Sequence, residues 1–288
     1  MRRAQWKILQ MLQTMVEIPS YIYGFETGKS IPVMSQIHVG QDFVVSLDIK
    51  DYFPSIKQWM IKKVFQLMDF GDGPASILSE LCTYKAFVPQ GALTSPKISN
   101  IIAASTFGPE IHELCMSHRL NLSIYADDIT ISGKFEEGRE DYPLHVLIQK
   151  VTDIVNKYGF WINYDKTKVM RPHHRQWVCG AVVNSKVNVM RKERLRLRGI
   201  VHNCRVNGVE VEAAKSGMDT LSFVRKFAGR LNWFNQLNPE KAGPLCAEFK
   251  ALTAPLIKLH PAFDLDPLVY SSGIESVSSN KDLNQVPF

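Results

Sequence analysis

The chain has 288 residues, 45% hydrophobic and 22% charged, and its 34 lysines and arginines exceed its 28 acidic residues, giving a net charge of +6. This composition excludes disorder over the whole chain and supplies enough apolar side chains for two or three packed subdomains. No stretch approaches the ~18 uninterrupted apolar residues of a membrane-spanning helix. The five cysteines include no CxxC pair, which argues against a zinc ribbon or a disulfide scaffold. We therefore expect a globular cytoplasmic protein with no membrane partner.

Helices and strands alternate in the first half of the chain. Residues 1–17 predict an amphipathic helix, and a loop-like segment follows over Tyr23–Gly40. The apolar stripe of that helix consists of Trp6, Leu9, Leu12 and Val16. Further helices are predicted over 57–69, 75–83 and from Pro96 to about His118. The β-prone runs are Phe43–Ile49, Leu122–Tyr125 and Ile129–Ser132, and Asp127-Asp128, with Ala126 before them, fit a tight turn between the last two.

The second half begins with a predicted helix over 143–158 and two strand candidates, near Trp161–Tyr164 and Val178–Val183. Residues 190–260 are mostly helical by pattern, and the tail from Asp264 shows no periodicity. The order strand, helix, hairpin, helix, strand predicts a mostly antiparallel sheet with helices on one face. This is an α+β fold of the ferredoxin-like kind, followed by a separate helical subdomain.

Three acidic residues lie at the tips of predicted strands. Asp48 ends one apolar run, and Asp127 and Asp128 lie at the apex of the predicted hairpin. Aspartate is disfavoured within sheets, and adjacent carboxylates repel unless cations neutralise them. Two hard divalent ions held by such carboxylates would suit phosphoryl transfer. The alternative is a plain turn pair, because aspartate tolerates turn geometry.

Four segments in order resemble the motifs of reverse transcriptases. They are Leu47–Ile56 with its Asp48, Pro89–Pro96 with Gln-Gly and Ser-Pro, Tyr125–Asp128 as the Tyr-x-Asp-Asp box, and Asn163–Thr167 as Asn-x-x-Lys-Thr. The resemblance implies a right-hand polymerase fold whose antiparallel, ferredoxin-like palm sheet is backed by helices, with truncated fingers and a helical thumb. It assigns 1–40 to partial fingers, 41–185 to the palm, about 57–90 to a finger-side helical insertion, 186–262 to the thumb and 263–288 to a C-terminal tail.

The same resemblance implies roles for particular residues. Asp48, Asp127 and Asp128 would be catalytic and would hold two Mg²⁺ ions, with Mn²⁺ possible, and Lys166 would act as a general acid. The substrate-binding positions would be Ile49 through its carbonyl, Tyr52, Phe53, Gln90 and Gly91. Phe53 matches a steric gate that favours deoxynucleotides, with plain core packing as the alternative. Lys166 and the nearby Lys168 could instead be two solvated lysines.

Two further segments resemble the bacterial retron type of reverse transcriptase. Val178–Asn184 resembles Val-Thr-Gly-Leu-Val-Val-Asn, and Arg191–His202 resembles the basic helix after it. This implies DNA synthesis from dNTPs on a structured noncoding RNA that supplies template and primer, an RNA–DNA hybrid product, a role in antiphage defence and a possible effector protein.

The chain also departs from the retron pattern. Cys179 replaces the threonine, and only His38 remains of an Asn-Ala-x-x-His motif; we interpret His38 as structural. The N-terminal finger strands of the family have no counterpart in this sequence: either the start of the chain is misplaced, a partner supplies the strands, or the enzyme is divergent. This departure keeps open the alternative of a weakly active RNA-binding scaffold. A second alternative is a defence polymerase with untemplated or protein-primed synthesis.

Positive charge concentrates between Arg171 and Arg205, where nine basic residues accompany the single acid Glu193. The candidate nucleic-acid contacts are Arg191, Lys192, Arg194 and Arg198. Such a run binds polyanions or forms a solvated helix face.

Overall fold

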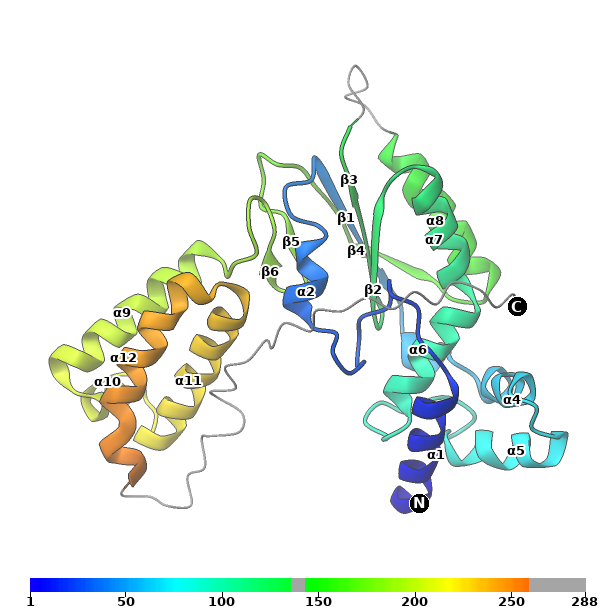
Figure 1. Ribbon diagram of the computed structural model, residues 1–288, viewed down its shortest axis with the longest axis horizontal. Helices are drawn as coiled ribbons and strands as arrows, with labels where there is room; N and C mark the ends of the chain where they lie inside the picture. Colours follow the sequence, from blue (N-terminus) through cyan, green and yellow to red (C-terminus); the bar gives the residue numbers. More distant parts are fainter. Residues whose placement is uncertain (136–142, 259–288) are drawn as a thin grey trace, which may run out of the picture. The chain divides into compact units, whose positions relative to one another are not determined.

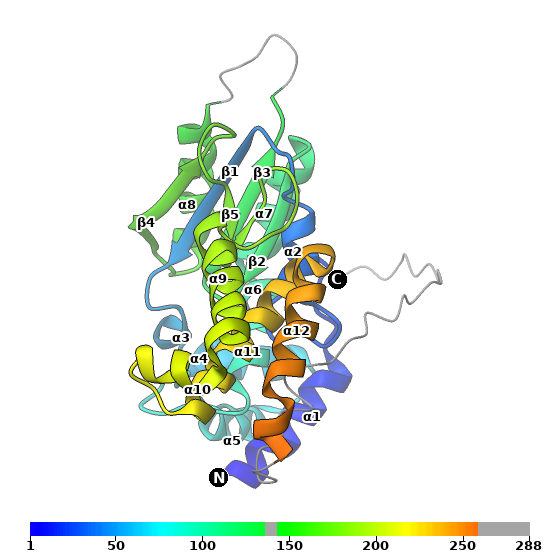
Figure 2. The same ribbon diagram turned by 90° about the vertical axis from the view of Figure 1, so that its left-hand side faces the viewer.

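The computed structural model describes residues 1–135 and 143–258, and its central feature is a four-stranded antiparallel sheet (Figure 1). The strands are β1 (Phe43–Ile49), β2 (Asn121–Tyr125), β3 (Asp128–Gly133) and β4 (Ile162–Met170), in the order β2-β3-β1-β4. All three neighbouring pairs are antiparallel, and the strands run side by side in Figure 2. The predicted ferredoxin-like α+β fold is confirmed.

Helices α6 (Ser95–Ser105), α7 (Phe107–Ser117) and α8 (Leu144–Lys157) cover one face of this sheet (Figure 1). Alternate residues of β1, beginning with Phe43 and Val45, point into this helical layer because side chains alternate along a strand. The largest hydrophobic core of the described residues lies here. This packing fixes β1 and β3 beside each other.

The opposite face of the sheet carries a smaller layer. It consists of α2 (Ile31–Gln36) and the hairpin of β5 (Trp177–Val178) and β6 (Ala181–Val182). Met34, Val178 and Val183 pack there against Val44 of β1. Figure 1 shows α2, β5 and β6 on the side of the sheet away from α7 and α8. Strands β1 and β3 are thus buried between two layers, whereas most of β4 remains exposed.

The N-terminal half of the chain contains four further helices: α1 (Arg2–Met15), α3 (Tyr52–Ser55), α4 (Gln58–Leu67) and α5 (Asp72–Leu81). Helix α1 packs against α5 and α6 through Ile8 and Leu12. The predicted stripe was wrong at Trp6, which is 52% exposed. The helix is turned so that Ile8 rather than Trp6 faces the core.

Four predicted elements differ in the structure. Helix α2 lies inside the segment expected to be a loop, where the Ser30 side chain caps it and a proline follows at its start. The helix predicted from Pro96 to His118 is two helices, with a break at Thr106 (φ −125°, ψ −106°). A Cβ on Gly108 would lie 2.4 Å from the carbonyl oxygen of Ala103, so the bend requires glycine there.

The third difference concerns the strand predicted over Val178–Val183. It is instead a hairpin whose two-residue turn is Cys179-Gly180. Both turn residues have positive φ, 44° and 85°, as a tight turn between twisted strands requires. Strand β4 also runs six residues beyond the predicted Trp161–Tyr164, to Met170.

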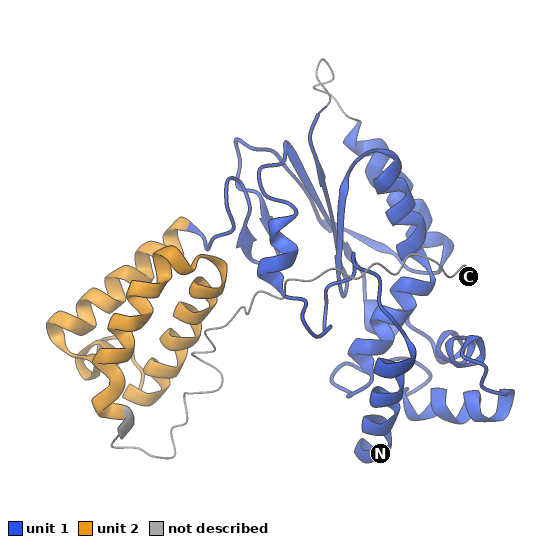
Figure 3. Ribbon diagram, viewed as in Figure 1, with its two compact units in different colours: residues 1–190 blue, residues 191–288 orange. Residues whose placement is uncertain are grey.

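The chain divides into two compact units, residues 1–190 and 191–288 (Figure 3). The second unit contains α9 (Arg191–Asn207), α10 (Val209–Lys215), α11 (Thr220–Leu237) and α12 (Pro239–Lys258). Its buried phenylalanines include Phe223, Phe227 and Phe234 of α11. The division into fingers, palm and thumb stays a prediction, and the predicted tail over 263–288 lies outside the described residues. Nowhere in the described chain is there a helix with the length and apolarity to span a bilayer.

Candidate active site

Asp48 and Asp128 lie directly opposite each other on neighbouring strands. The antiparallel register of β1 and β3 pairs these two residues, and the Ile49 N–H donates to the Asp127 carbonyl oxygen at 2.8 Å. Two carboxylates opposite each other on one face of a sheet lie close together. Asp48 is 79 residues before Asp127 and 80 before Asp128 in the sequence. The pairing of β1 with β3 therefore brings the three acids together at one end of the sheet.

The hairpin turn differs from the predicted one by one residue. Tyr125 pairs with Asp128, so the turn residues are Ala126 and Asp127, and Ala126 has a φ of 53°. Asp128 is the first residue of β3 rather than a turn residue. The turn alone therefore gives no reason for aspartate at position 128.

Burial and mutual repulsion disfavour the ionised forms of Asp127 and Asp128. Burial raises the pKa of Asp128 to about 6, and the charges of Asp127 and Asp48 add to the shift. Burial also raises the pKa of Asp127, with a further contribution from Asp48. Partly buried like charges are characteristic of sites that bind a cation.

Lys166 of β4 reaches the same cluster. Its Nζ donates to Asp48 Oδ1 at 2.8 Å, and this hydrogen bond raises the pKa of the ammonium group. Lys168 instead lies with its Nζ 4.5 Å from the ring centroid of Trp177. The structure thus distinguishes the two lysines, and only Lys166 pairs with a carboxylate of the cluster.

Cys179 is a site residue that the sequence alone showed only as a departure from the retron pattern. Its Sγ lies 3.8 Å from Asp128 Oδ2. Burial, with the nearby Asp128 charge, raises the pKa of the thiol to about 12, which keeps it protonated and able to donate to the carboxylate. Only the tertiary fold reveals this contact, because the hairpin of β5 and β6 lies 51 residues away in sequence.

The predicted substrate-binding residues fall into two groups. Ile49 and Tyr52 are buried, and the Tyr52 hydroxyl donates to the Ser99 carbonyl at 2.6 Å, so the Tyr52 ring packs in the core rather than facing a substrate. Phe53 is partly buried at the edge of the same core. Gln90 and Gly91 are exposed in the loop before α6, where Gly91 has a φ of 91°.

The predicted nucleic-acid contacts lie on α9, in the second unit. Arg191, Lys192 and Arg198 are exposed, and Arg194 is half-buried. Arg191, Arg194 and Arg198 are spaced by three and four residues and share one face of the helix, whereas Lys192 lies on another.

The donor chemistry of the cluster fits a hard divalent cation. Three carboxylates supply the oxygen ligands that Mg²⁺ prefers. Within residues 1–135 and 143–258, no three His, Cys, Asp or Glu side chains are already arranged as a ligand set. Because Lys166 holds one oxygen of Asp48, a cation at Asp48 would compete with this ammonium group.

Comparison with known proteins places the chain in a family. A family model described as reverse transcriptase (RNA-dependent DNA polymerase) matches residues 1–211. The retron Mx65 reverse transcriptase of Myxococcus xanthus is 28% identical over 87% of this chain and 59% of its own length. The retron Ec86 reverse transcriptase of Escherichia coli is 30% identical over 69% of this chain and 60% of its own length. The chain thus spans about 60% of the length of these curated relatives.

A solved structure shows the same fold at low sequence identity. The apo telomerase of Candida tropicalis aligns over 91% of this chain and 50% of its own, with a TM-score of 0.51 and 12% identity. This likeness agrees with the predicted polymerase fold. From the match to the family model and the retron relatives, the chain belongs to the reverse transcriptase family and to its bacterial retron type.

Proposed function

We propose that this protein is an RNA-directed DNA polymerase that transfers nucleotides from dNTPs to a primer hydroxyl. The observation that carries the proposal is the cross-strand pair of Asp48 and Asp128, with Asp127 at the adjoining turn. A membership in the reverse transcriptase family supports the same activity.

The chain's own groups suit this reaction. The three carboxylates would hold the metal ions, and two Mg²⁺ ions, or Mn²⁺ in their place, would neutralise charge on the attacking hydroxyl and on the departing pyrophosphate. Lys166 is exposed and protonated beside Asp48, so its ammonium could donate a proton to the leaving group. Phe53 lies at the edge of the core, five residues after Asp48 in the sequence, and would exclude a ribose 2′-hydroxyl. Gln90 and Gly91 would approach the template and the incoming nucleotide.

The activity is tested by dNTP incorporation on a primed RNA in the presence of Mg²⁺. Asp127→Asn removes one carboxylate charge without a large change in shape, and we expect it to abolish incorporation. Asp165→Asn is the matched control, because Asp165 is exposed on β4 next to Lys166. Equal incorporation by wild type and Asp127→Asn, or none by either, would contradict the proposal and favour an RNA-binding scaffold.

We further propose that the template and primer belong to a structured noncoding RNA, and that the product is an RNA–DNA hybrid used in antiphage defence in the bacterial cytoplasm. The retron reverse transcriptases among the relatives support this assignment. Sequencing of the nucleic acid that copurifies with the protein tests it, with a branched RNA–DNA species as the expected result. DNA made without template, or attached to the protein, would indicate the other kind of defence polymerase. A copurifying protein would identify an effector.

A further inference from the structure

Phe25 is an exposed aromatic residue in an unfavourable backbone conformation. Its φ is 61°, in the left-handed region that bulky residues rarely adopt, and its side chain is 50% exposed. Its ring makes a tilted contact with that of Tyr125, with centroids 5.8 Å apart and planes at 46°. Because the ring remains half exposed, its burial in a core does not explain the unfavourable backbone conformation of Phe25. The residues on either side of Phe25 must hold its backbone in place.

The segment before Phe25 is fixed to the outer edge of the sheet. Ile22 forms a parallel bridge with Ile124 of β2, and the Tyr23 N–H donates to the Ile124 carbonyl oxygen at 2.8 Å. Gly24 lies so close to the hairpin turn that a Cβ there would be 3.0 Å from the backbone nitrogen of Ala126. The chain therefore reaches Phe25 from a position determined by the turn that carries Asp127.

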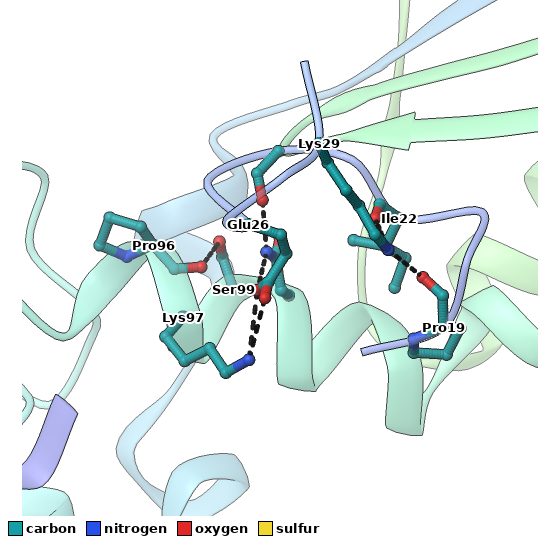
Figure 4. A network of polar contacts seen from close by, with 9 residues as sticks. Pro19, Ile22, Glu26, Lys29, Pro96, Lys97 and Ser99 are labelled. Atoms are coloured by element: carbon teal, nitrogen blue, oxygen red, sulfur yellow. Dashed lines mark hydrogen bonds and ion pairs between the residues drawn. The ribbon is translucent and has the colours of Figure 1, made fainter. Parts of the chain in front are cut away.

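The segment after Phe25 is fixed to α6. Glu26 forms a partly buried ion pair with Lys97 at 3.1 Å and accepts a hydrogen bond from Asn100 at 2.8 Å. Lys29 donates to the carbonyl oxygens of Pro19 and Ile22 at 2.7 and 2.6 Å, which closes the loop on itself. Figure 4 shows Glu26 beside Lys97 and the Lys29 ammonium between Pro19 and Ile22. Contacts on both sides thus hold Phe25 in its conformation.

Tyr125, which contacts Phe25, lies beside one of the carboxylates. Tyr125 is paired across the hairpin with Asp128, which is a predicted metal ligand. In a polymerase the primer end must lie at these carboxylates, and its bases must therefore pass close to the hairpin. Exposed aromatic rings beside such a path bind bases by stacking.

We propose that Phe25, supported by Tyr125, is a stacking platform for a nucleobase near the primer terminus. This inference rests on the proposed function. The ligand is a nucleobase of either strand, DNA primer or RNA template. The anchors Glu26, Lys97 and Lys29 position the platform and do not contact the base.

The Phe25→Gly variant tests the role of the aromatic ring without disturbing the fold. Glycine adopts a φ of 61° without strain, so this variant should melt at or above the wild-type temperature while losing the aromatic surface. We expect its Kd for a primed RNA to rise about 5- to 150-fold, the range for loss of one stacked base. Phe25→Trp should bind at least as tightly as wild type. Trp59→Ala, which removes an aromatic side chain 64% exposed on α4, is the matched control and should leave the Kd unchanged.

A fluorescent base analogue, 2-aminopurine, identifies the strand. It is placed at the 3′ end of the DNA primer in one substrate and opposite that end in the RNA template in another. Its fluorescence should change on binding to wild type and not to Phe25→Gly, in the substrate whose base stacks. If Phe25→Gly shows the wild-type Kd and the wild-type fluorescence change with both substrates, the stacking proposal is wrong, while the proposed polymerase function is unaffected. Absence of dNTP incorporation by wild type would instead contradict the proposed function.

Discussion

At Asp128, burial and the charges of two neighbouring acids all act against the ionised side chain, and its pKa rises to about 6. Such an arrangement lowers the stability of the fold at neutral pH, because a pKa shift measures a free-energy difference between folded and unfolded chains. Residues that serve a site often lower stability in this way. The contact with Cys179 offsets only part of the effect.

We therefore predict that Asp128→Asn stabilises the protein in the absence of divalent cations, by roughly 1 to 3 kcal/mol near pH 7.5. The amide keeps the shape of the side chain and removes its charge. Mg²⁺ should stabilise the wild type, since a ligand that binds only the folded state raises its stability, and should stabilise Asp128→Asn much less. Denaturant unfolding with and without Mg²⁺ at matched ionic strength measures both effects.

Asp165→Asn is again the control, because this exposed aspartate is on β4. It should keep both the wild-type stability and the wild-type response to Mg²⁺. A response in Asp128→Asn as large as in wild type would show that the ion binds elsewhere.

At the scale of elements, α9 has two distinct faces. Leu197, Val201 and Cys204 are buried, which fixes the orientation of the helix in the second unit. Arg194 and Arg198 lie four residues apart beside that buried face, and Arg205 continues the row but pairs with Glu248 at 3.6 Å. A row of arginines along a helix suits the regularly spaced phosphates of a nucleic acid.

We predict that Arg194→Glu combined with Arg198→Glu weakens binding to an RNA–DNA duplex and reduces its salt dependence. Each phosphate contact contributes about 0.9 to the slope of log K against log salt for a B-form duplex, so loss of two contacts should lower that slope by up to about 1.8. Binding titrations at several salt concentrations measure it. Lys192→Glu plus Arg196→Glu, on another side of α9, is the comparison. An unchanged slope in the first variant would identify the row as a solvated face.

At the scale of the whole molecule, a buried polar contact joins the segment after α2 to strands β2 and β3 of the sheet. His38 is fully buried just beyond α2, and its two ring nitrogens lie 2.7 and 2.8 Å from the hydroxyl oxygens of Ser132 and Ser123. The predicted structural role of His38 is confirmed by these contacts. Burial lowers the pKa of the imidazole to about 3.

The sign of the resulting pH effect follows directly. The unfolded chain binds a proton at His38 below about pH 6.5, whereas the folded protein does so only near pH 3. Stability from this group is therefore present above pH 6.5 and is lost as the pH falls. We expect a loss of about 2 kcal/mol between pH 7 and pH 5 that is absent in His38→Asn. Denaturant unfolding at several pH values measures it, and His173→Asn, at an exposed histidine, should retain the wild-type slope.

Sequence patterns predicted elements well where local signals agree. The run Phe43–Ile49 matched β1 at both ends because apolar β-branched residues fill it and polar residues bound it. The break at Thr106 was missed because the apolar periodicity continues through it, and only the approach of Gly108 to Ala103 reveals the bend. The hairpin turn was misplaced by one residue, because the sequence pattern does not specify which residue of β2 pairs with which residue of β3.

The motifs by themselves determined the family and the fold class, and they predicted the three acids as the metal ligands, since all of these depend on residue types at fixed spacings. Tertiary structure decided which lysine meets Asp48, that Cys179 approaches Asp128, and that Tyr52 is in the core. It also decided that the ring of Phe25 contacts that of Tyr125. Each of these contacts joins segments that are far apart in sequence or depends on how an element is turned, and such contacts arise only when the layers pack together.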